Sequence, residues 1–315
     1  MEKSYPKISV IIICYNQEDV ISRAIDSLLI QKEYFYELII SDDCSTDNTW
    51  SIIEDYQKKY PDIVKAYRQE VNQGVYENLQ STYDKVTGEM VFFLSGDDES
   101  GPELFKKTCE TVNEKNLDYK KDRFCVITDF KVIANNGKER IIKKNALVNK
   151  YNPFSLKYRG IITNRALGES ITTFRDRKHY IERGSSPIPT SLQEGYTDIM
   201  PFVYTKDIFY IPYAGNTYYA GIGVATRFIK YREEYLKGLI EYCEKAPDYF
   251  DSLNRFDKNW LSFHKAKTEF LLNPMISNYG KYFIMFFKLA QDPLRKYFLS
   301  NEIKRFIKTV KLLFQ

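Results

Sequence analysis

A run of apolar residues near the amino terminus, ISVIIIC at Ile8–Cys14, constrains the fold more than any other feature of the chain. β-branched side chains dominate it and almost no polar residue alternates with them, which is typical of a strand buried on both faces of a parallel sheet. Parallel strands need crossover connections, which are usually helices. The run therefore predicts an α/β protein in which strands and helices alternate.

The amino-terminal part of the chain carries this alternation. Apolar residues at helical spacing between Val20 and Leu29 predict a helix, and Asn16 followed by Asp19 predicts its cap. Gly88 is expected to end a later helix. The remaining elements are predicted as strands at Glu37–Ile40, Ile63–Tyr67 and Glu89–Leu94 and helices at 47–60 and 76–86. Such a series gives a twisted, mostly parallel sheet flanked by helices.

Polar side chains follow three of the predicted strands, in the segments Cys14–Asn16, Ser41–Asp43 and Ser95–Asp98. Because ligands bind at the carboxyl ends of parallel strands, we expect these segments to meet at one edge of the sheet. Carboxylates gathered there repel each other unless a cation joins them, and Mg²⁺ or Mn²⁺ binds one or two carboxylates together with phosphate oxygens. The pattern predicts a site for a nucleotide diphosphate and a divalent metal.

The motifs, in this order, resemble those of the family 2 nucleotide-sugar glycosyltransferases, which have the GT-A fold. ISVIIICYNQE is similar to the family's opening strand and turn, LIISDDCSTDNT to its D-D-x-S-x-D segment and NQGVYENL to its N-x-G stretch. GEMVFFLSGDD resembles its metal-binding D-x-D region. The resemblance is strong over residues 6–105, weakens in the middle of the chain and says little after about residue 230.

The resemblance implies roles for six residues. The nucleoside part of the site would be lined by Tyr15, Asn16, Asp43 and Asn72, with Asp97 near the ribose and Asp98 on Mn²⁺ or Mg²⁺. Ser95 stands where the family often has an acidic residue, so fewer carboxylates would hold the metal.

The aspartates after the second strand also have a plainer interpretation. Asp42, Asp43 and Asp47 are residue types that turns and helix caps favour. The carboxylates of Asp97 and Asp98 on the same predicted edge favour a function for the first two. Asp47 remains a predicted helix cap.

A catalytic base is expected in the segment EGYTDIMPF, residues 194–202. This segment resembles the family's E-D element, with Thr197 where Glu is common and Asp198 in the position of the base. A carboxylate can remove the proton of an acceptor hydroxyl as that oxygen attacks, and the resemblance implies inversion in a single displacement. Glu194 is the rival base, and Asp198 could instead be a carboxylate that stabilises a helix amino terminus.

The motifs favour a glycosyltransferase that uses a nucleotide-diphosphate donor, preferably a UDP-sugar, and a saccharide or lipid-linked saccharide acceptor. A bacterial surface polysaccharide is the pathway that analogy suggests. A catalytically silent nucleotide- or sugar-binding module stays open, because Ser95 and Thr197 each replace an acidic residue. A nucleotidyltransferase is less favoured, since ICYNQEDV lacks a glycine-rich phosphate loop with Lys or Arg.

The chain is expected to have two domains. Residues 1–225 would form the GT-A-like catalytic domain, with the nucleotide-binding half at 1–105 and the acceptor half at 106–225. Residues 226–315, which look helical, would form a carboxyl-terminal extension.

Within the acceptor half, strand-like residues at 124–133 and 139–142 flank the turn signal Asn135–Lys138 and predict a hairpin. Residues 143–193 have no clear period and are expected to form a loop region on the acceptor side.

Charge and composition limit the partners. The net charge of +4 gives no field for nucleic acid, so none is expected to bind. Basic and apolar residues gather in 279–314, as in helices that lie on a membrane surface, although a bundle packed on the catalytic domain explains the apolar stripe equally well. The five cysteines are an odd number and include no C-x-x-C pair, and the start MEKSYPK is not followed by an apolar secretory core. Both features favour the cytoplasm, at the inner face of the cell membrane if these helices bind lipid.

Overall fold

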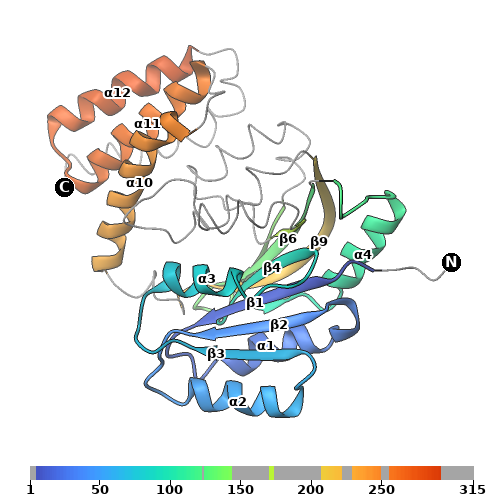
Figure 1. Ribbon diagram of the computed structural model, residues 1–315. Helices are drawn as coiled ribbons and strands as arrows, with labels where there is room; N and C mark the ends of the chain where they lie inside the picture. Colours follow the sequence, from blue (N-terminus) through green and yellow to red (C-terminus); the bar gives the residue numbers. More distant parts are fainter. Residues whose placement is uncertain are drawn as a thin grey trace. The chain divides into compact units, whose positions relative to one another are not determined.

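The computed structural model describes residues 5–122, 124–143, 170–173, 207–221, 229–249 and 255–291 (Figure 1). These residues form two compact units, one ending at Gly221 and one starting at Ile229. The domain boundary expected after residue 225 lies outside the described residues.

The first unit is built on a sheet whose parallel part has the strand order β3-β2-β1-β4. These strands are β1 (Ile8–Cys14), β2 (Glu37–Asp42), β3 (Val64–Arg68) and β4 (Met90–Ser95). β1 pairs in parallel with both β2 and β4, and every residue of β1 is buried. The predicted α/β fold with a mainly parallel sheet is confirmed.

Helices cover both faces of this sheet (Figure 1). They are α1 (Ile21–Leu29), α2 (Thr49–Lys59), α3 (Val75–Tyr83) and α4 (Leu104–Glu114), with a short 3₁₀ helix η1 (Lys32–Tyr34). Apolar side chains of α1, α2 and α4 share a core with Val10 and Ile12 on one face, and those of α3 pack against Ile11 and Ile13 on the other. The alternation of β1 side chains between the faces explains why its sequence is apolar throughout.

The sheet continues beyond β4 through strands that come later in the chain. They are β5 (Glu99–Ser100), β6 (Phe124–Ile133), β7 (Glu139–Ile142), β8 (Ser170–Thr173) and β9 (Asp207–Tyr219). β8 joins β4 to β6 in antiparallel pairing, β9 runs parallel to β6, and β5 pairs antiparallel with β9. β6 and β7 form the predicted hairpin, with Gly137 at a φ of 74° in its turn.

Three local predictions were wrong. Residues 170–173 lie in the expected loop region but form β8, because the open edges of β4 and β6 supply backbone partners that no sequence period announces. Asn16 does not cap α1, which begins after Val20 without a side-chain cap. Gly88 does not cap α3, which ends at Tyr83; a Cβ at Gly88 would lie 2.5 Å from the Lys7 carbonyl oxygen, so the residue permits close packing.

The second unit consists of α10 (Ile229–Tyr249), α11 (Arg255–Leu272) and α12 (Ile276–Ala290). α11 packs against both of the other helices, and Trp260, Phe263, Phe270 and Tyr282 are buried within the unit. The expected carboxyl-terminal helices are therefore present. Among the helices that the structure describes, none is both long and apolar enough to cross a membrane.

Glu37, the first residue of β2, is a buried carboxylate at the amino-terminal end of the parallel strands. It accepts hydrogen bonds from the Ser9 hydroxyl at 2.6 Å and the Thr87 backbone N–H at 2.7 Å, and it pairs with Lys65. Burial alone would raise the pKa of Glu37, but the bonds from Lys65, Ser9 and Thr87 hold it below its ordinary value. The charged form of Glu37 therefore stabilises the fold.

We expect the Glu37→Gln variant to lower the free energy of unfolding at pH 7 by about 1–3 kcal/mol, because it removes the charge that faces Lys65. A carboxylate with a depressed folded-state pKa stabilises above its unfolded pKa of about 4.3 and loses that effect as the pH falls through the folded value. Urea denaturation should therefore show a smaller difference between the variant and the wild type at pH 3 than at pH 7.

Asp55→Asn is the control, since it breaks an exposed ion pair with Lys58. Its cost should stay below about 0.5 kcal/mol at either pH. An equal loss for Glu37→Gln at both pH values would contradict the assigned role of the charge.

Candidate active site

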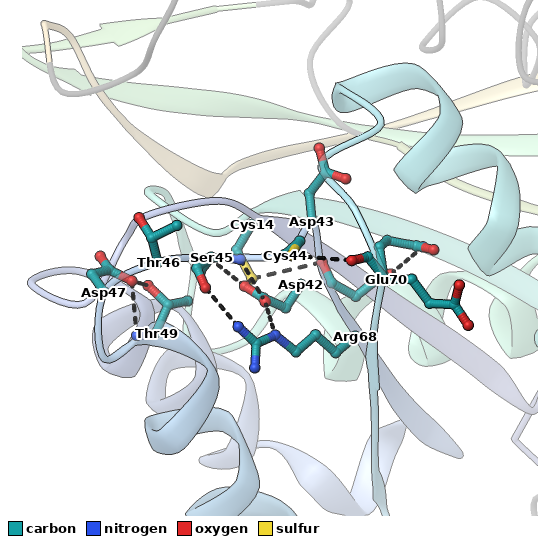
Figure 2. Close-up of polar contacts among 12 residues, drawn as sticks. Cys14, Asp42, Asp43, Cys44, Ser45, Thr46, Asp47, Thr49, Arg68 and Glu70 are labelled. Atoms are coloured by element: carbon teal, nitrogen blue, oxygen red, sulfur yellow. Dashed lines mark hydrogen bonds and ion pairs between the residues drawn. The ribbon is translucent and has the colours of Figure 1, made fainter.

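Asp42, at the end of β2, organises the loop that follows this strand (Figure 2). Its fully buried carboxylate accepts the backbone N–H of Ser45 at 2.9 Å and the hydroxyl of the same residue, and lies 3.5 Å from Nε of Arg68. Arg68 also donates to the Ser45 carbonyl oxygen at 2.7 Å. The carboxylate of Asp42 is thus engaged inside the protein and shapes the loop, which corrects the expectation that it serves a ligand.

Two cysteines lie at this loop, Cys14 at the end of β1 and Cys44 within the loop itself. The Cys14 thiol lies 3.8 Å from Oδ1 of Asp42, and burial, followed by the charge of Asp42, raises its pKa well above the ordinary value. Cys14 therefore stays a protonated thiol that packs between the strands. Cys44 has a φ of 61° and turns the chain in the left-handed region.

The carboxylate of Asp43 points away from the Asp42 cluster, toward the segment before α3 (Figure 2). It accepts the backbone N–H groups of Gln73 and Gly74, each at 2.8 Å. The backbone N–H of Asp43 donates to the Cys14 carbonyl oxygen at 2.9 Å. Asp43 therefore joins the end of β1 to the segment that carries Asn72, which is exposed.

Tyr15 and Asn16 lie beside the same loop. The Oδ1 atom of Asn16 accepts the Thr46 backbone N–H at 2.8 Å, and the Asn16 N–H donates to the Ser45 hydroxyl oxygen at 2.9 Å. These bonds explain why Asn16 is not available as a helix cap. The neighbouring Tyr15 is 37% exposed, so its ring can receive a planar ligand.

Asp47 lies one residue before Asn48, the N-cap of α2, so the predicted cap is one position off, although its carboxylate still binds the first residue of the helix. Its carboxylate accepts the Thr49 backbone N–H at 2.9 Å and the Glu18 N–H at 3.2 Å. Burial alone would raise the pKa of Asp47, but these bonds and the one from the Thr49 hydroxyl keep it below its ordinary value.

Asp97 and Asp98 form a buried acidic pair in the turn after β4. The Ser95 hydroxyl donates to Oδ1 of Asp97 at 2.6 Å, and Oδ1 of Asp98 accepts the Tyr219 backbone N–H at 3.2 Å. Burial and then the charge of Asp97 raise the pKa of Asp98 to about 8. The charged form of Asp98 is therefore disfavoured unless a cation compensates its charge.

The acidic pair fits a hard divalent cation, although the protein contributes few ligands. Oδ2 of Asp98 has no hydrogen-bond partner within the described part of the chain, and carboxylate oxygens are the donors that Mg²⁺ and Mn²⁺ prefer. No cluster of three or more metal-ligating side chains exists among the described residues. A cation on Asp98 would thus need further oxygens from water or from a diphosphate.

Gly96 allows the acidic turn to lie against the start of α1. A Cβ at this position would come within 2.2 Å of Oε1 of Gln17 and 3.0 Å of Cδ1 of Ile21. The Gly96 N–H donates to the Ile13 carbonyl oxygen at 3.2 Å, which ties the turn to β1.

The structure brings most of the expected residues to one edge of the sheet. Hydrogen bonds join Asn16, Asp43 and the segment of Asn72 around the end of β1, and the turn of Asp97 and Asp98 binds the same strand through Gly96. Asp198, its rival Glu194 and Thr197 lie outside the described residues.

A second group, which was not predicted, lies beside the acidic turn: Arg23 from α1, Glu99 from β5 and Tyr219 from β9. The hydroxyl of Tyr219 donates to Oε1 of Glu99 at 2.8 Å. Burial and this hydrogen bond raise the pKa of Tyr219 to about 12, so the hydroxyl keeps its proton. The pairing of β5 with β9 assembles this group, and no local motif encodes it.

The site can be compared with known proteins. The putative teichuronic acid biosynthesis glycosyltransferase TuaG of Bacillus subtilis is 30% identical over 177 residues, which are 55% of this chain and 63% of TuaG. The GalNAc(5)-diNAcBac-PP-undecaprenol beta-1,3-glucosyltransferase of Campylobacter jejuni is 28% identical over 198 residues, 56% of this chain and 63% of that protein. The chain spans less of two other relatives, 34% and 37% of their lengths.

A solved structure of S. aureus TarS 1-349 in complex with UDP-GlcNAc resembles the fold, with a TM-score of 0.60 and 18% identity over 90% of this chain and 81% of that one. The model of the family described as glycosyl transferase family 2 matches residues 9–165, about half of the chain. This segment contains both acidic loops of the site. Through it the chain belongs to glycosyl transferase family 2, and its first unit has the GT-A type of fold.

Proposed function

We propose that this protein transfers a sugar from a nucleotide-diphosphate donor, preferably a UDP-sugar, to a hydroxyl of a saccharide or lipid-linked saccharide. The observation that carries the proposal is the meeting of the loops after β1, β2 and β4 at one edge of a family 2 domain. TarS with UDP-GlcNAc and the Campylobacter relative, whose name includes PP-undecaprenol, support this choice of donor and acceptor. By the same analogy we place the protein in the synthesis of a bacterial surface polysaccharide.

In this proposal the donor nucleotide binds along the edge formed by Tyr15, Asn16, Asp43 and Asn72. The exposed Tyr15 ring offers a stacking surface, and each Asp43 oxygen keeps a second lone pair beyond its bond to the loop before α3. Asp97 would lie near the ribose. Asp98 would hold Mn²⁺ or Mg²⁺, which when bound neutralises the charge of the leaving diphosphate.

We further propose that Asp198 takes the proton of the acceptor hydroxyl as its oxygen attacks the anomeric carbon, in a single inverting displacement. The resemblance of residues 194–202 to the family's E-D element supports this role, with Glu194 as the rival. The alternative of a silent module rests partly on Ser95, which replaces an acidic residue. Ser95 still contributes to the acidic pair, because its hydroxyl donates to the Asp97 carboxylate, and this weakens the alternative.

The exposed face of α12 is the surface that we propose for membrane contact, within the predicted segment 279–314. Phe283, Ile284 and Phe287 are exposed there, and Lys281 and Lys288 are exposed on the same helix. Exposed aromatic rings beside lysines suit an anionic lipid surface. Such contact would bring the enzyme to a lipid-linked acceptor at the cytoplasmic face of the membrane.

We expect Asp98→Asn to weaken metal-dependent nucleotide binding at least tenfold, about 1.4 kcal/mol, because the variant loses the charged oxygen that faces the cation. Calorimetry with UDP and with GDP, each with and without Mn²⁺, measures this and identifies the donor class. Glu37→Gln is the control, since it removes a buried carboxylate at the other end of the strands. Metal-dependent binding that survives in Asp98→Asn would exclude Asp98 as the ligand.

Asp198→Asn should reduce sugar transfer by a factor of about 10²–10⁴ while UDP affinity stays unchanged, because the base acts on the acceptor and not on the nucleotide. The measurement is UDP release from a UDP-sugar with saccharide acceptors, beside calorimetry for UDP. Glu194→Gln is the paired variant. A large loss in Glu194→Gln with an active Asp198→Asn would assign the base to Glu194.

Replacing both Phe283 and Phe287 with Ser should reduce sedimentation with vesicles of anionic lipid several-fold, because the variant loses apolar area on the exposed face of α12. High salt should also weaken binding by the wild type. Ile141→Ser, at an exposed apolar residue of β7, is the control. If the wild-type protein does not sediment with vesicles, membrane contact is excluded and these helices are interpreted as a packed bundle.

A further inference from the structure

Arg23 makes three kinds of contact around the acidic turn. From the first turn of α1, its Nη2 atom donates to the Asp97 carbonyl oxygen at 2.7 Å. Its Nε atom forms an ion pair with Oε1 of Glu99 at 3.0 Å. Its guanidinium carbon lies 3.7 Å from the centre of the Tyr219 ring. One side chain thus contacts the backbone of the turn, the strand that follows it and the end of β9.

Tyr219 extends this group to Asp98. Its hydroxyl donates to Glu99, the residue that also pairs with Arg23, and its backbone N–H donates to Oδ1 of Asp98 at 3.2 Å. Hydrogen bonds from the hydroxyl and from the backbone N–H therefore hold Tyr219 in place, and the guanidinium of Arg23 lies over the face of its ring. The planar guanidinium can lie over the ring while two of its nitrogens face different acceptors, an arrangement that the compact ammonium of lysine does not reproduce.

The contacts also determine the charge around the acidic pair. Arg23 places a positive charge beside the buried carboxylates of Asp97 and Asp98, and Glu99 partly offsets it. Because Arg23 bonds the carbonyl group of Asp97 and not its carboxylate, both acidic side chains remain available to a ligand. The arrangement supports the pair without occupying it.

We infer that Arg23 is a positioning residue for the Asp97–Asp98 pair, which it holds in the orientation that binds a divalent cation and the donor diphosphate. Arg23 acts through the Asp97 backbone, Glu99 and Tyr219 and touches neither cation nor substrate. The expected effect on cation and diphosphate binding rests on the proposed function. The contacts that hold the turn are present without any ligand and can be tested separately.

The test compares three variants of the full chain. Arg23→Met keeps the length of the side chain and removes its charge and donors, whereas Arg23→Lys keeps the charge and loses the planar fork. Lys107→Met is a matched control, because Lys107 has the same 32% side-chain exposure, pairs with Glu103 and lies over the Tyr213 ring. Urea denaturation establishes that each variant is folded before it is assayed.

Hydrogen–deuterium exchange of the ligand-free protein reports on the turn itself. Amide protons of residues 96–100 should exchange faster in Arg23→Met than in the wild type, while Lys107→Met leaves them unchanged. Unchanged exchange of this segment in Arg23→Met would overturn the inference.

Calorimetric titration with Mn²⁺ and UDP reports on the consequence. The apparent Mn²⁺ affinity should fall about tenfold in Arg23→Met, less in Arg23→Lys and not at all in Lys107→Met. If the wild type shows metal-dependent binding, an unchanged Mn²⁺ dependence in folded Arg23→Met would overturn the inference. If the wild type shows no metal-dependent binding while exchange of the turn rises in Arg23→Met, the proposed metal site fails and the positioning of the turn by Arg23 stands.

Discussion

The end of β1 is the point on which the site depends. The Ile13 carbonyl oxygen accepts the N–H of Gly96, and the Cys14 carbonyl oxygen accepts the N–H of Asp43. One strand thus holds both the loop after β2 and the acidic turn after β4. Because β1 is buried along its whole length and pairs with β2 and β4, these bonds have little freedom to move. A rigid strand end is what a site for a charged ligand requires.

The aspartates of the two loops differ in whether other groups of the protein already bind their carboxylate oxygens. Asp42 is fully buried and bonded to Ser45 and Arg68, so its carboxylate stabilises the loop. Asp98 is almost as buried, but among the described residues its carboxylate accepts one hydrogen bond, from the Tyr219 N–H. A buried carboxylate with so few partners is costly by itself, and a bound cation would offset that cost. Asp98 is therefore the better candidate for a ligand, although both residues follow parallel strands.

The sequence predicted the parallel half of the sheet because local patterns encode it: apolar runs form the strands, and helical periods separate them. It also placed Asp43, Asp97 and Asp98 at one edge, since parallel strands share their carboxyl ends. It could not predict β8 or the group of Arg23 and Tyr219, because these depend on pairing between distant segments. Asn16 shows the same limit, for its side chain caps no helix and bonds Thr46 instead.

The orientation of Asp98 depends on a residue 121 positions later in the chain. Tyr219 lies outside the segment of residues 9–165 that matches the family model, at the end of a strand that pairs with β6 along most of its length. The acidic turn can therefore form its local bonds early, from the Ser95 hydroxyl to Asp97 and from the Asp98 N–H to the Ser95 carbonyl oxygen, but the Asp98 carboxylate gains the Tyr219 N–H only when β9 has joined the sheet. Bonds of this separation form late because their loop-closure entropy must be overcome first. The orientation of the Asp98 carboxylate is thus a property of the completed sheet, and the four sequence motifs supply only its parts.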